Sequence, residues 1–145
     1  MTDTRAQRKR VLILCTGNSA RSQIAEALLR HIASERFEPF SAGIEPRAEV
    51  HPGALDVLRR NHIPTRDLRP KHFSTFEGQP FSYVITLCDR ARERCPTFDR
   101  VEMMHWTFAD PTAAPDLDDR RRAFDDYFAG LSTRLRFLII VDEKP

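Results

Sequence analysis

The sequence predicts a single α/β domain, a three-layer sandwich in which a central four-stranded parallel sheet carries helices on both faces. Short apolar runs alternate along the chain with segments of helical periodicity. The first run is apolar throughout, which is typical of strands buried on both faces. A chain of 145 residues, 41% hydrophobic and 30% charged, has the size and composition of one globular domain. We therefore assign residues 1–145 to one domain and expect residues 1–10 to form a flexible N-terminal segment.

The first half of the chain predicts two strands and two helices. Residues 11–15 predict the first strand, and apolar residues at helical spacing predict a helix that begins near Ala20. Residues 37–42 predict the second strand. Pro52 is placed as the first residue of a second helix, which residues 61–62 end.

The second half predicts two more strands and a long helix. Residues 81–87 and 101–106 predict the third and fourth strands, and the polar residues 64–80 predict a connecting loop. An amphipathic helix is predicted from Leu117 onward, although residues 137–141 also permit a strand. Because ligand sites of parallel sheets lie at the carboxyl ends of the strands, we expect the site to follow the first, third and fourth strands.

Composition excludes several classes of protein. A net charge of +2 is too small to argue for nucleic-acid binding, and no apolar run is long enough for a signal peptide or a membrane span. Three cysteines leave one unpaired in any disulfide framework, which favours a reducing environment. We expect a cytoplasmic protein, monomeric, with no nucleic-acid or membrane partner.

The loop after the first strand is the strongest functional signal. Small or polar residues between a strand and a helix leave successive backbone N–H groups free to converge on a tetrahedral oxyanion, assisted by the helix dipole. The expected oxyanion-binding residues are Thr16, Gly17, Asn18, Ser19, Ala20, Arg21 and Ser22. The planar guanidinium of Arg21 matches the geometry of such an anion.

Cys15 stands at the mouth of this loop and is the predicted nucleophile. Helix N-termini and nearby cations lower thiol pKa values, so we expect the pKa of Cys15 to be lowered. The Ser22 hydroxyl can donate a hydrogen bond to the thiolate, and Asn18 tolerates the left-handed backbone that such loops need. A metal site is not predicted, because no Cys-x-x-Cys or paired histidines stand at ligand spacing.

Residues 15–23, followed by a helix, closely resemble the phosphate-binding loop of low-molecular-weight protein tyrosine phosphatases and of the arsenate reductases that share their fold. The segment Ser-Ala-Gly at 41–43 is similar to one shared by both groups. The resemblance extends from about Val11 to the C-terminal helix. It implies the fold predicted above and an activity on phosphate or arsenate.

The other two cysteines favour the reductases. Cys88 with the residues before it, and Cys95 with Pro96, resemble the redox segment of thioredoxin-coupled arsenate reductases. Seven residues of helix separate two Cα atoms by about 10 Å, beyond the limit of about 7 Å for a disulfide. A bond between the two cysteines therefore requires the intervening residues to unwind, and their charged character favours this.

Asp110, followed by Pro111, resembles the second catalytic loop of the same enzymes. Tyrosine phosphatases of this fold usually follow the Asp-Pro pair with aromatic residues, whereas residues 112–114 read Thr-Ala-Ala. The resemblance implies that Cys15 attacks arsenate, that Asp110 is the general acid, and that Cys88 and then Cys95 carry the disulfide onward to thioredoxin or another thiol donor.

No tightly bound cofactor is expected. Some members of the family bind potassium; Asn18, Glu26 and Ser41 match ligand positions, but Lys71 falls near where an aspartate is expected, which argues against an ion site. Two alternatives remain at this stage: a low-molecular-weight tyrosine phosphatase with redox-regulated cysteines, and a non-enzymatic oxyanion sensor.

Overall fold

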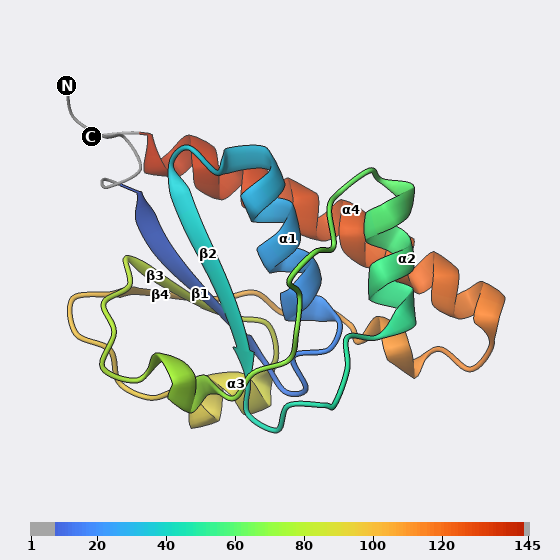
Figure 1. The fold of residues 1–145 in the computed structure, drawn as a ribbon, viewed down its shortest axis with the longest axis horizontal. Coiled ribbons are helices and arrows are strands. Elements are labelled where there is room, and N and C mark those ends of the chain that lie inside the picture. Colours follow the sequence, from blue (N-terminus) through green and yellow to red (C-terminus); the bar gives the residue numbers. More distant parts are fainter. Residues whose placement is uncertain (1–7, 144–145) are drawn as a thin grey trace.

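A four-stranded parallel sheet forms the centre of the computed structural model, which describes residues 8–143 (Figure 1). Its strands are β1 (Lys9–Cys15), β2 (Phe37–Gly43), β3 (Tyr83–Thr86) and β4 (Glu102–His105). They lie in the order β2-β1-β3-β4, and each neighbouring pair is parallel. The predicted sheet is confirmed, and because all four strands are parallel, their carboxyl ends lie at one edge of the sheet.

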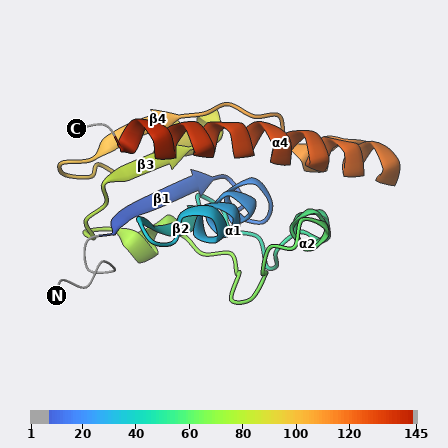
Figure 2. The ribbon, with the colours of Figure 1, turned by 90° about the horizontal axis from the view of Figure 1, so that it is seen from above.

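The helices are α1 (Arg21–Ala33), α2 (Pro52–Arg60), α3 (Asp89–Arg94) and α4 (Leu117–Asp142), with short 3₁₀ turns η2 (Phe73–Phe76) and η3 (Pro111–Ala113). Figure 2 shows α4 running lengthwise past the sheet and on toward α2. The helix continues through residues 137–141, so the alternative strand is wrong there. The buried Leu131, Leu135 and Leu138 keep helical spacing to the end, which explains this outcome.

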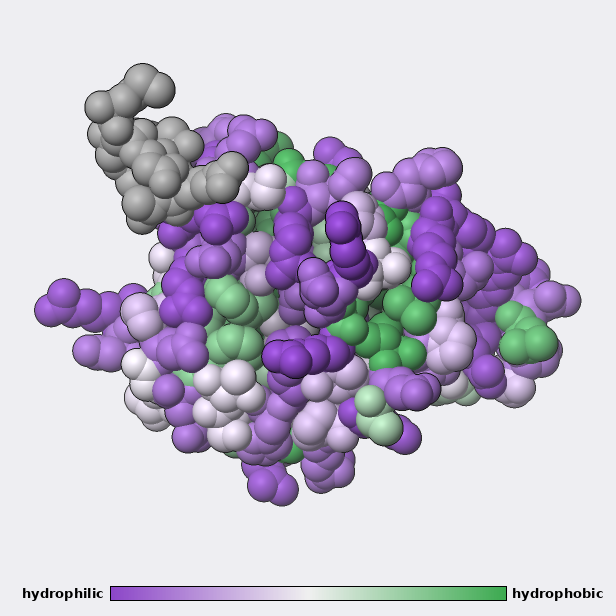
Figure 3. All heavy atoms as spheres, viewed as in Figure 1, coloured by the Kyte–Doolittle hydropathy of each residue, from purple (hydrophilic) through white to green (hydrophobic). Residues whose placement is uncertain are grey.

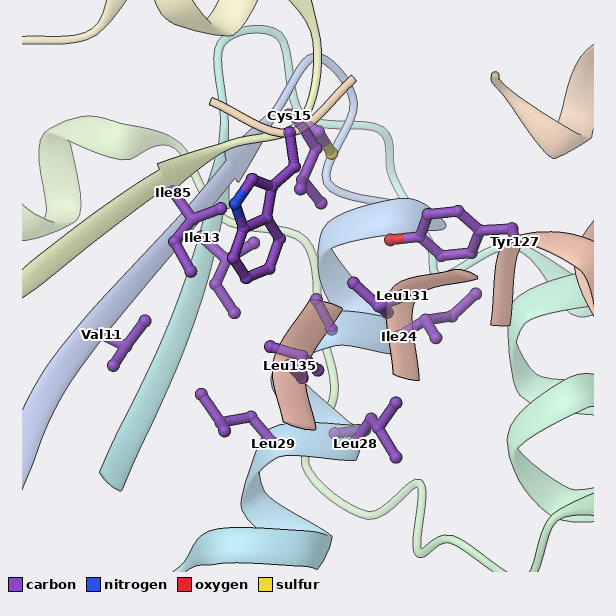
Figure 4. Close-up of a cluster of buried hydrophobic side chains, with 14 of the residues drawn as sticks. Val11, Ile13, Cys15, Ile24, Leu28, Leu29, Ile85, Tyr127, Leu131 and Leu135 are labelled. Atoms are coloured by element: carbon purple, nitrogen blue, oxygen red, sulfur yellow. The ribbon is translucent and has the colours of Figure 1, made fainter. Parts of the chain in front are cut away.

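The two faces of the sheet carry separate hydrophobic clusters. Val11, Ile13 and Cys15 point into a large cluster formed with α1, α2 and α4 (Figure 4), whereas Leu12 and Leu14 point to the opposite face. Such alternation follows from the two-residue period of a strand. On the opposite face the cover consists of short elements, including α3 and η2. The predicted sandwich is confirmed, with one thick and one thin helical layer.

The N-terminal boundary differs from the expectation. Residues 1–10 were expected to be flexible, but Lys9 and Arg10 belong to β1. The ammonium of Lys9 lies 2.5 Å from the carboxylate of Asp142, and the guanidinium of Arg10 lies 4.6 Å from the ring centres of Phe40 and Phe81. These contacts explain why the strand starts earlier. The rest of the expected flexible segment, residues 1–7, lies outside the described residues.

The surface is mostly hydrophilic on the face that Figure 3 shows. Across residues 8–143, none of the helices combines the length and the apolar character needed to cross a bilayer.

Candidate active site

The loop between β1 and α1 is held by the segment that follows β2. The carbonyls of Cys15, Thr16, Gly17 and Ser19 accept hydrogen bonds, at 2.8–3.2 Å, from the backbone N–H groups of Ile44, Glu45, Arg47 and His51 in that order. In a trans peptide the N–H points away from the C=O. Because these carbonyls are held by the segment after β2, the N–H groups of the following residues are expected to turn inward, which is the arrangement that the predicted anion cradle requires.

Cys15 is the last residue of β1 and is 3% exposed. Burial raises the pKa of its thiol; the Ser22 hydroxyl, the backbone N–H groups of Ser22 and Asn18, and the charge of Arg21 oppose this effect. The expectation of a lowered pKa is thus not confirmed. The reason is that the same sheet edge that brings the donors together also removes the sulfur from water.

A hydrogen-bond network holds the Ser22 hydroxyl beside the sulfur of Cys15. The Ser22 oxygen lies 2.8 Å from the Cys15 sulfur and accepts a hydrogen bond from the side-chain amide of Asn18 at 2.7 Å. Because this bond occupies a lone pair of the hydroxyl, its single hydrogen is free to point at the sulfur. Asn18 is fully buried and has φ of 49°, the left-handed conformation expected for it.

Arg21 begins α1 beside the cradle, as predicted, and is positioned by residues from the other end of the chain. Its guanidinium donates to the Phe108 carbonyl at 3.3 Å and lies 3.9 Å from the carboxylate of Asp110. The hydroxyl of Tyr127 donates to the backbone carbonyl of Arg21 at 2.6 Å. Burial raises the pKa of Tyr127 well above its ordinary value, so this hydroxyl keeps its proton.

Asp110 reaches the same cavity from the loop after β4. One carboxylate oxygen accepts hydrogen bonds from the N–H and the hydroxyl of Thr112, at 2.9 and 2.7 Å. The other oxygen is the one that approaches Arg21. The carboxyl group therefore lies beside Arg21 in the lining of the cavity, and its role as general acid stays a prediction.

The cavity above Cys15 measures about 550 Å³. Its lining comprises residues 15–21, Arg47, Glu49, Val50, His51, Pro52, Asp110 and Thr112. None of these described residues is Phe, Tyr or Trp. The residues at 47–52 were missed from the sequence, although the rule that loops gather at the carboxyl edge of a parallel sheet could have indicated the segment after β2.

Cys88 lies at the rim of the cradle. Its sulfur is 3.2 Å from the hydroxyl of Thr16, the first residue of the anion loop. Cys88 contacts the hydrophobic clusters on both faces of the sheet and is partly exposed. The second thiol thus lies beside the first residue of the anion loop, and its reaction with Cys15 stays a prediction.

Cys88 immediately precedes α3 and Cys95 immediately follows it. Cys95 packs against the cluster on the opposite face from Cys15, and burial raises its pKa to about 11. All three cysteines are free thiols. Because the six residues of α3 stand between them, a Cys88–Cys95 disulfide is still predicted to require α3 to unwind.

The charged residues of α3 are less free than the sequence indicated. Asp89 lies 3.1 Å from the imidazole of His105, Arg90 pairs with Glu45, and Ala91 is fully buried. Unwinding of α3 must therefore break the hydrogen bond between Asp89 and His105 and the surface ion pair between Arg90 and Glu45, each weak on its own. Among the described residues no cluster of three His, Cys, Asp or Glu side chains is arranged to hold a metal ion.

Comparison with known proteins gives the class to which this fold and site belong. Residues 10–136 match the family model of the low molecular weight phosphotyrosine protein phosphatases, and the chain belongs to that family. Its relatives there include the arsenate reductase of Oceanobacillus iheyensis, which is 33% identical over 115 residues, covering 79% of this chain and 82% of that protein. The expected resemblance is confirmed.

Solved structures of other proteins share this fold. The thioredoxin-dependent arsenate reductase of Corynebacterium glutamicum superimposes with a TM-score of 0.76 at 28% identity, covering 94% of this chain. This chain spans 62% of the length of that protein. The tyrosine phosphatase Wzb of Escherichia coli K30 shares the fold, with a TM-score of 0.74 at 22% identity over 90% of this chain and 97% of that one.

Proposed function

We propose that this protein reduces arsenate to arsenite by a relay through Cys15, Cys88 and Cys95. The observation that carries the proposal is the position of Cys88, whose sulfur lies 3.2 Å from the Thr16 hydroxyl of the anion loop. A phosphatase needs only the nucleophile, the cradle and the acid. A second thiol at the rim is what a reductase adds to them.

Arsenate binding uses groups already in place. The inward N–H groups of residues 16–21 and the guanidinium of Arg21 hold the oxyanion, and the Cys15 thiolate attacks arsenic to form a sulfur–arsenic bond. Asp110 gives a proton to the departing oxygen, which leaves as water. The same first step on a phosphate ester would give a phosphocysteine, so residual phosphatase activity is expected.

Reduction takes place in the second step. The sulfur of Cys88 attacks the sulfur of Cys15, the sulfur–arsenic bond breaks, and its electron pair leaves with arsenic as arsenite. The two thiols become one disulfide, which balances the two electrons gained by arsenic. Cys95 then attacks Cys88, so that a Cys88–Cys95 disulfide forms and Cys15 is released as a thiolate.

A dithiol must reduce the last disulfide before another turnover. The name of the C. glutamicum neighbour supports a thioredoxin-like donor, which exchanges its own thiols with the exposed end of α3. In this proposal no bound cofactor takes part, and the protein acts as a cytoplasmic monomer. The absence of Phe, Tyr and Trp from the described cavity lining supports the choice of a small oxyanion over a phosphotyrosine.

Thiol mapping tests the relay. The reduced protein is mixed with one equivalent of arsenate, alkylated and digested, and the disulfides are identified by mass spectrometry. We expect Cys88–Cys95 in the wild type and Cys15–Cys88 in the Cys95→Ser variant. The absence of any disulfide, together with efficient hydrolysis of an aryl phosphate, would leave the phosphatase as the function.

The cysteine variants give a matched comparison. Cys88→Ser and Cys95→Ser should each abolish multiple-turnover arsenate reduction and leave phosphate-ester hydrolysis within about twofold of wild type. Cys15→Ser should eliminate both activities. Unchanged arsenate turnover in either of the first two variants contradicts the three-thiol relay.

A further inference from the structure

Lys71 lies beside a buried carboxylate that the catalytic steps do not use. Lys71 belongs to the segment that runs alongside the end of β2, where Gly43 and His72 form an isolated parallel bridge. Its side chain is only 17% exposed, and its ammonium lies 3.8 Å from Glu26 and donates to the Arg69 carbonyl at 2.8 Å. A lysine so placed is a fixed positive charge next to α1.

Glu26 needs such a charge. It lies on α1 with 7% of its side chain exposed, and a carboxylate buried to this extent is costly unless it is paired and hydrogen-bonded. The Ser41 hydroxyl donates to one carboxylate oxygen at 2.7 Å, and Arg30 pairs with the other at 2.9 Å. Lys71 lies on the Ser41 side, toward the interior, whereas Arg30 is half exposed.

A chain of hydrogen bonds connects this carboxylate to the nucleophile. Because Ser41 gives its hydrogen to Glu26, its oxygen can accept the Asn18 amide at 3.0 Å. The same amide donates to Ser22, which faces Cys15. The charge on Glu26 thus sets the direction of the Ser41 hydroxyl, and the free oxygen of Ser41 helps to hold the Asn18 amide in the orientation that reaches Ser22.

Lys71 also contacts Asn18, in the middle of this chain of hydrogen bonds. Its backbone N–H donates to the side-chain oxygen of Asn18 at 2.9 Å. This bond fixes which side of the Asn18 amide faces Ser22 and Ser41. Lys71 therefore contacts the hydrogen-bond chain at two points: its ammonium lies near Glu26, and its backbone N–H donates to Asn18.

A potassium ion does not fit beside these residues. An alkali cation is held by oxygen atoms that are free to turn their lone pairs toward it. Here the Ser41 hydroxyl and the Lys71 ammonium both face Glu26. The side-chain oxygen of Asn18 accepts a hydrogen bond from the backbone N–H of Lys71. The Arg69 carbonyl accepts from the Lys71 ammonium and, at 2.8 Å, from the side chain of Gln23. An added cation would also meet the ammonium as a like charge.

We propose that the Lys71 ammonium is a built-in monovalent cation that holds the Glu26–Ser41–Asn18–Ser22 chain in the direction that places a donor on Cys15. Lys71 is a positioning residue in this scheme, since it touches neither the sulfur nor the substrate. The inference rests on the proposed function only in taking Cys15 as the nucleophile. It predicts an enzyme whose site needs no added alkali ion.

The wild-type protein gives the first test. Arsenate reduction and hydrolysis of p-nitrophenyl phosphate are measured in chloride salts of potassium, sodium and tetramethylammonium at one ionic strength. We expect kcat/KM to agree within about 1.5-fold among the three salts. Stimulation of several fold by potassium alone would overturn the proposal, and the phosphate ester keeps the test valid even if arsenate is not a substrate.

Substitution gives the second test. Lys71→Met keeps the length of the side chain and removes the charge. In a Cys88→Ser/Cys95→Ser background, where Cys15 is the only thiol, the rate of alkylation by iodoacetamide is followed against pH. We expect the midpoint to rise by about one pH unit, so that alkylation at pH 7 slows about tenfold. A role confined to folding would lower Tm and leave this midpoint unchanged.

Two further variants complete the design. Lys71→Asp supplies an oxygen ligand in place of the ammonium, and potassium, but not tetramethylammonium, should restore at least part of its alkylation rate. Arg59→Met removes an exposed charge on α2 and should shift neither the midpoint nor the salt response. If Lys71→Met has the wild-type midpoint and wild-type kcat/KM, the proposal is wrong; if it does not fold, the salt series on the wild type still decides.

Discussion

Replacing Ser22 with alanine should make Cys15 a weaker acid. The two side chains lie 2.8 Å apart and both are buried. Because a thiolate can only accept, the Ser22 hydroxyl, which also accepts from Asn18, donates to the sulfur when Cys15 is ionised. A hydrogen bond to a charged group contributes about 1.5–3 kcal/mol. At 1.36 kcal/mol per unit, its loss raises the pKa of Cys15 by about 1–2 units.

The sign of the effect sets the shape of the pH profile. Burial already raises the pKa of Cys15, and Ser22→Ala adds to that rise, so the thiolate forms only at still higher pH. Below the wild-type midpoint, alkylation and kcat/KM for p-nitrophenyl phosphate should fall about 10–100-fold. At pH above both midpoints the two proteins should converge.

The control is Thr133→Ala, which removes an exposed hydroxyl that bonds only the carbonyl four residues earlier in α4. It should leave the profile unchanged. A Ser22→Ala protein with the wild-type midpoint would show that this hydroxyl does not donate to the sulfur. A uniform loss of rate at every pH would instead indicate a distorted loop, and the pKa argument would be refuted.

Three further predictions concern the loop, the acid and the stability of the fold. Gly43→Ala would place a Cβ 2.7 Å from the Thr16 carbonyl oxygen, so we expect phosphate binding, measured by calorimetry, to weaken at least tenfold. Asp110→Asn should slow phenyl phosphate hydrolysis by about 100-fold or more, because this poor leaving group needs a proton; a normal rate would remove Asp110 as the acid. Burial alone would raise the pKa of Asp142, but hydrogen bonds from Lys9, Tyr83 and Arg36 hold it below its ordinary value. The ionised Asp142 therefore stabilises the fold above the unfolded pKa of about 3.9, and this stabilisation is lost as the pH falls through the lower pKa of the folded state. Asp142→Asn should reduce the free energy of unfolding at pH 7 by about 1.5–3 kcal/mol. Urea unfolding at pH 7 and at pH 3 checks this, since an equal effect at both values contradicts the assignment.

The parts of the site that the sequence predicted are those whose signal is local. A strand followed at once by small residues and a helix defines the cradle, and Cys15 and Arg21 lie within seven positions of each other. Asp110 and Cys88 needed one further rule, that parallel strands deliver their carboxyl ends to one edge. Both follow strands of the same sheet, and the structure brings both to the cavity or its rim.

What the sequence could not predict depends on contacts between distant segments. Arg47 and His51 enter the cavity because the stretch after β2 hydrogen-bonds to the loop carbonyls, which no spacing indicates. The extension of β1 to Lys9 depends on Asp142, at the other end of the chain. The pKa of Cys15 balances burial against four donors or charges, and its direction cannot be deduced from the motif.

The order of the thiols follows from the alternation of β1 and the length of α3. Cys15 points to the thick helical layer, while Cys95 packs in the cluster on the other face, so these two sulfurs cannot exchange directly across the intact sheet. Cys88 contacts both clusters and lies beside the loop, which makes it the one thiol able to react with either partner. The burial that raises the pKa of Cys95 to about 11 keeps it a thiol until α3 unwinds. In the proposed relay, opening of α3 therefore both activates Cys95 and brings it to Cys88, and we expect the second disulfide to form only after the contacts of Asp89 and Arg90 are released.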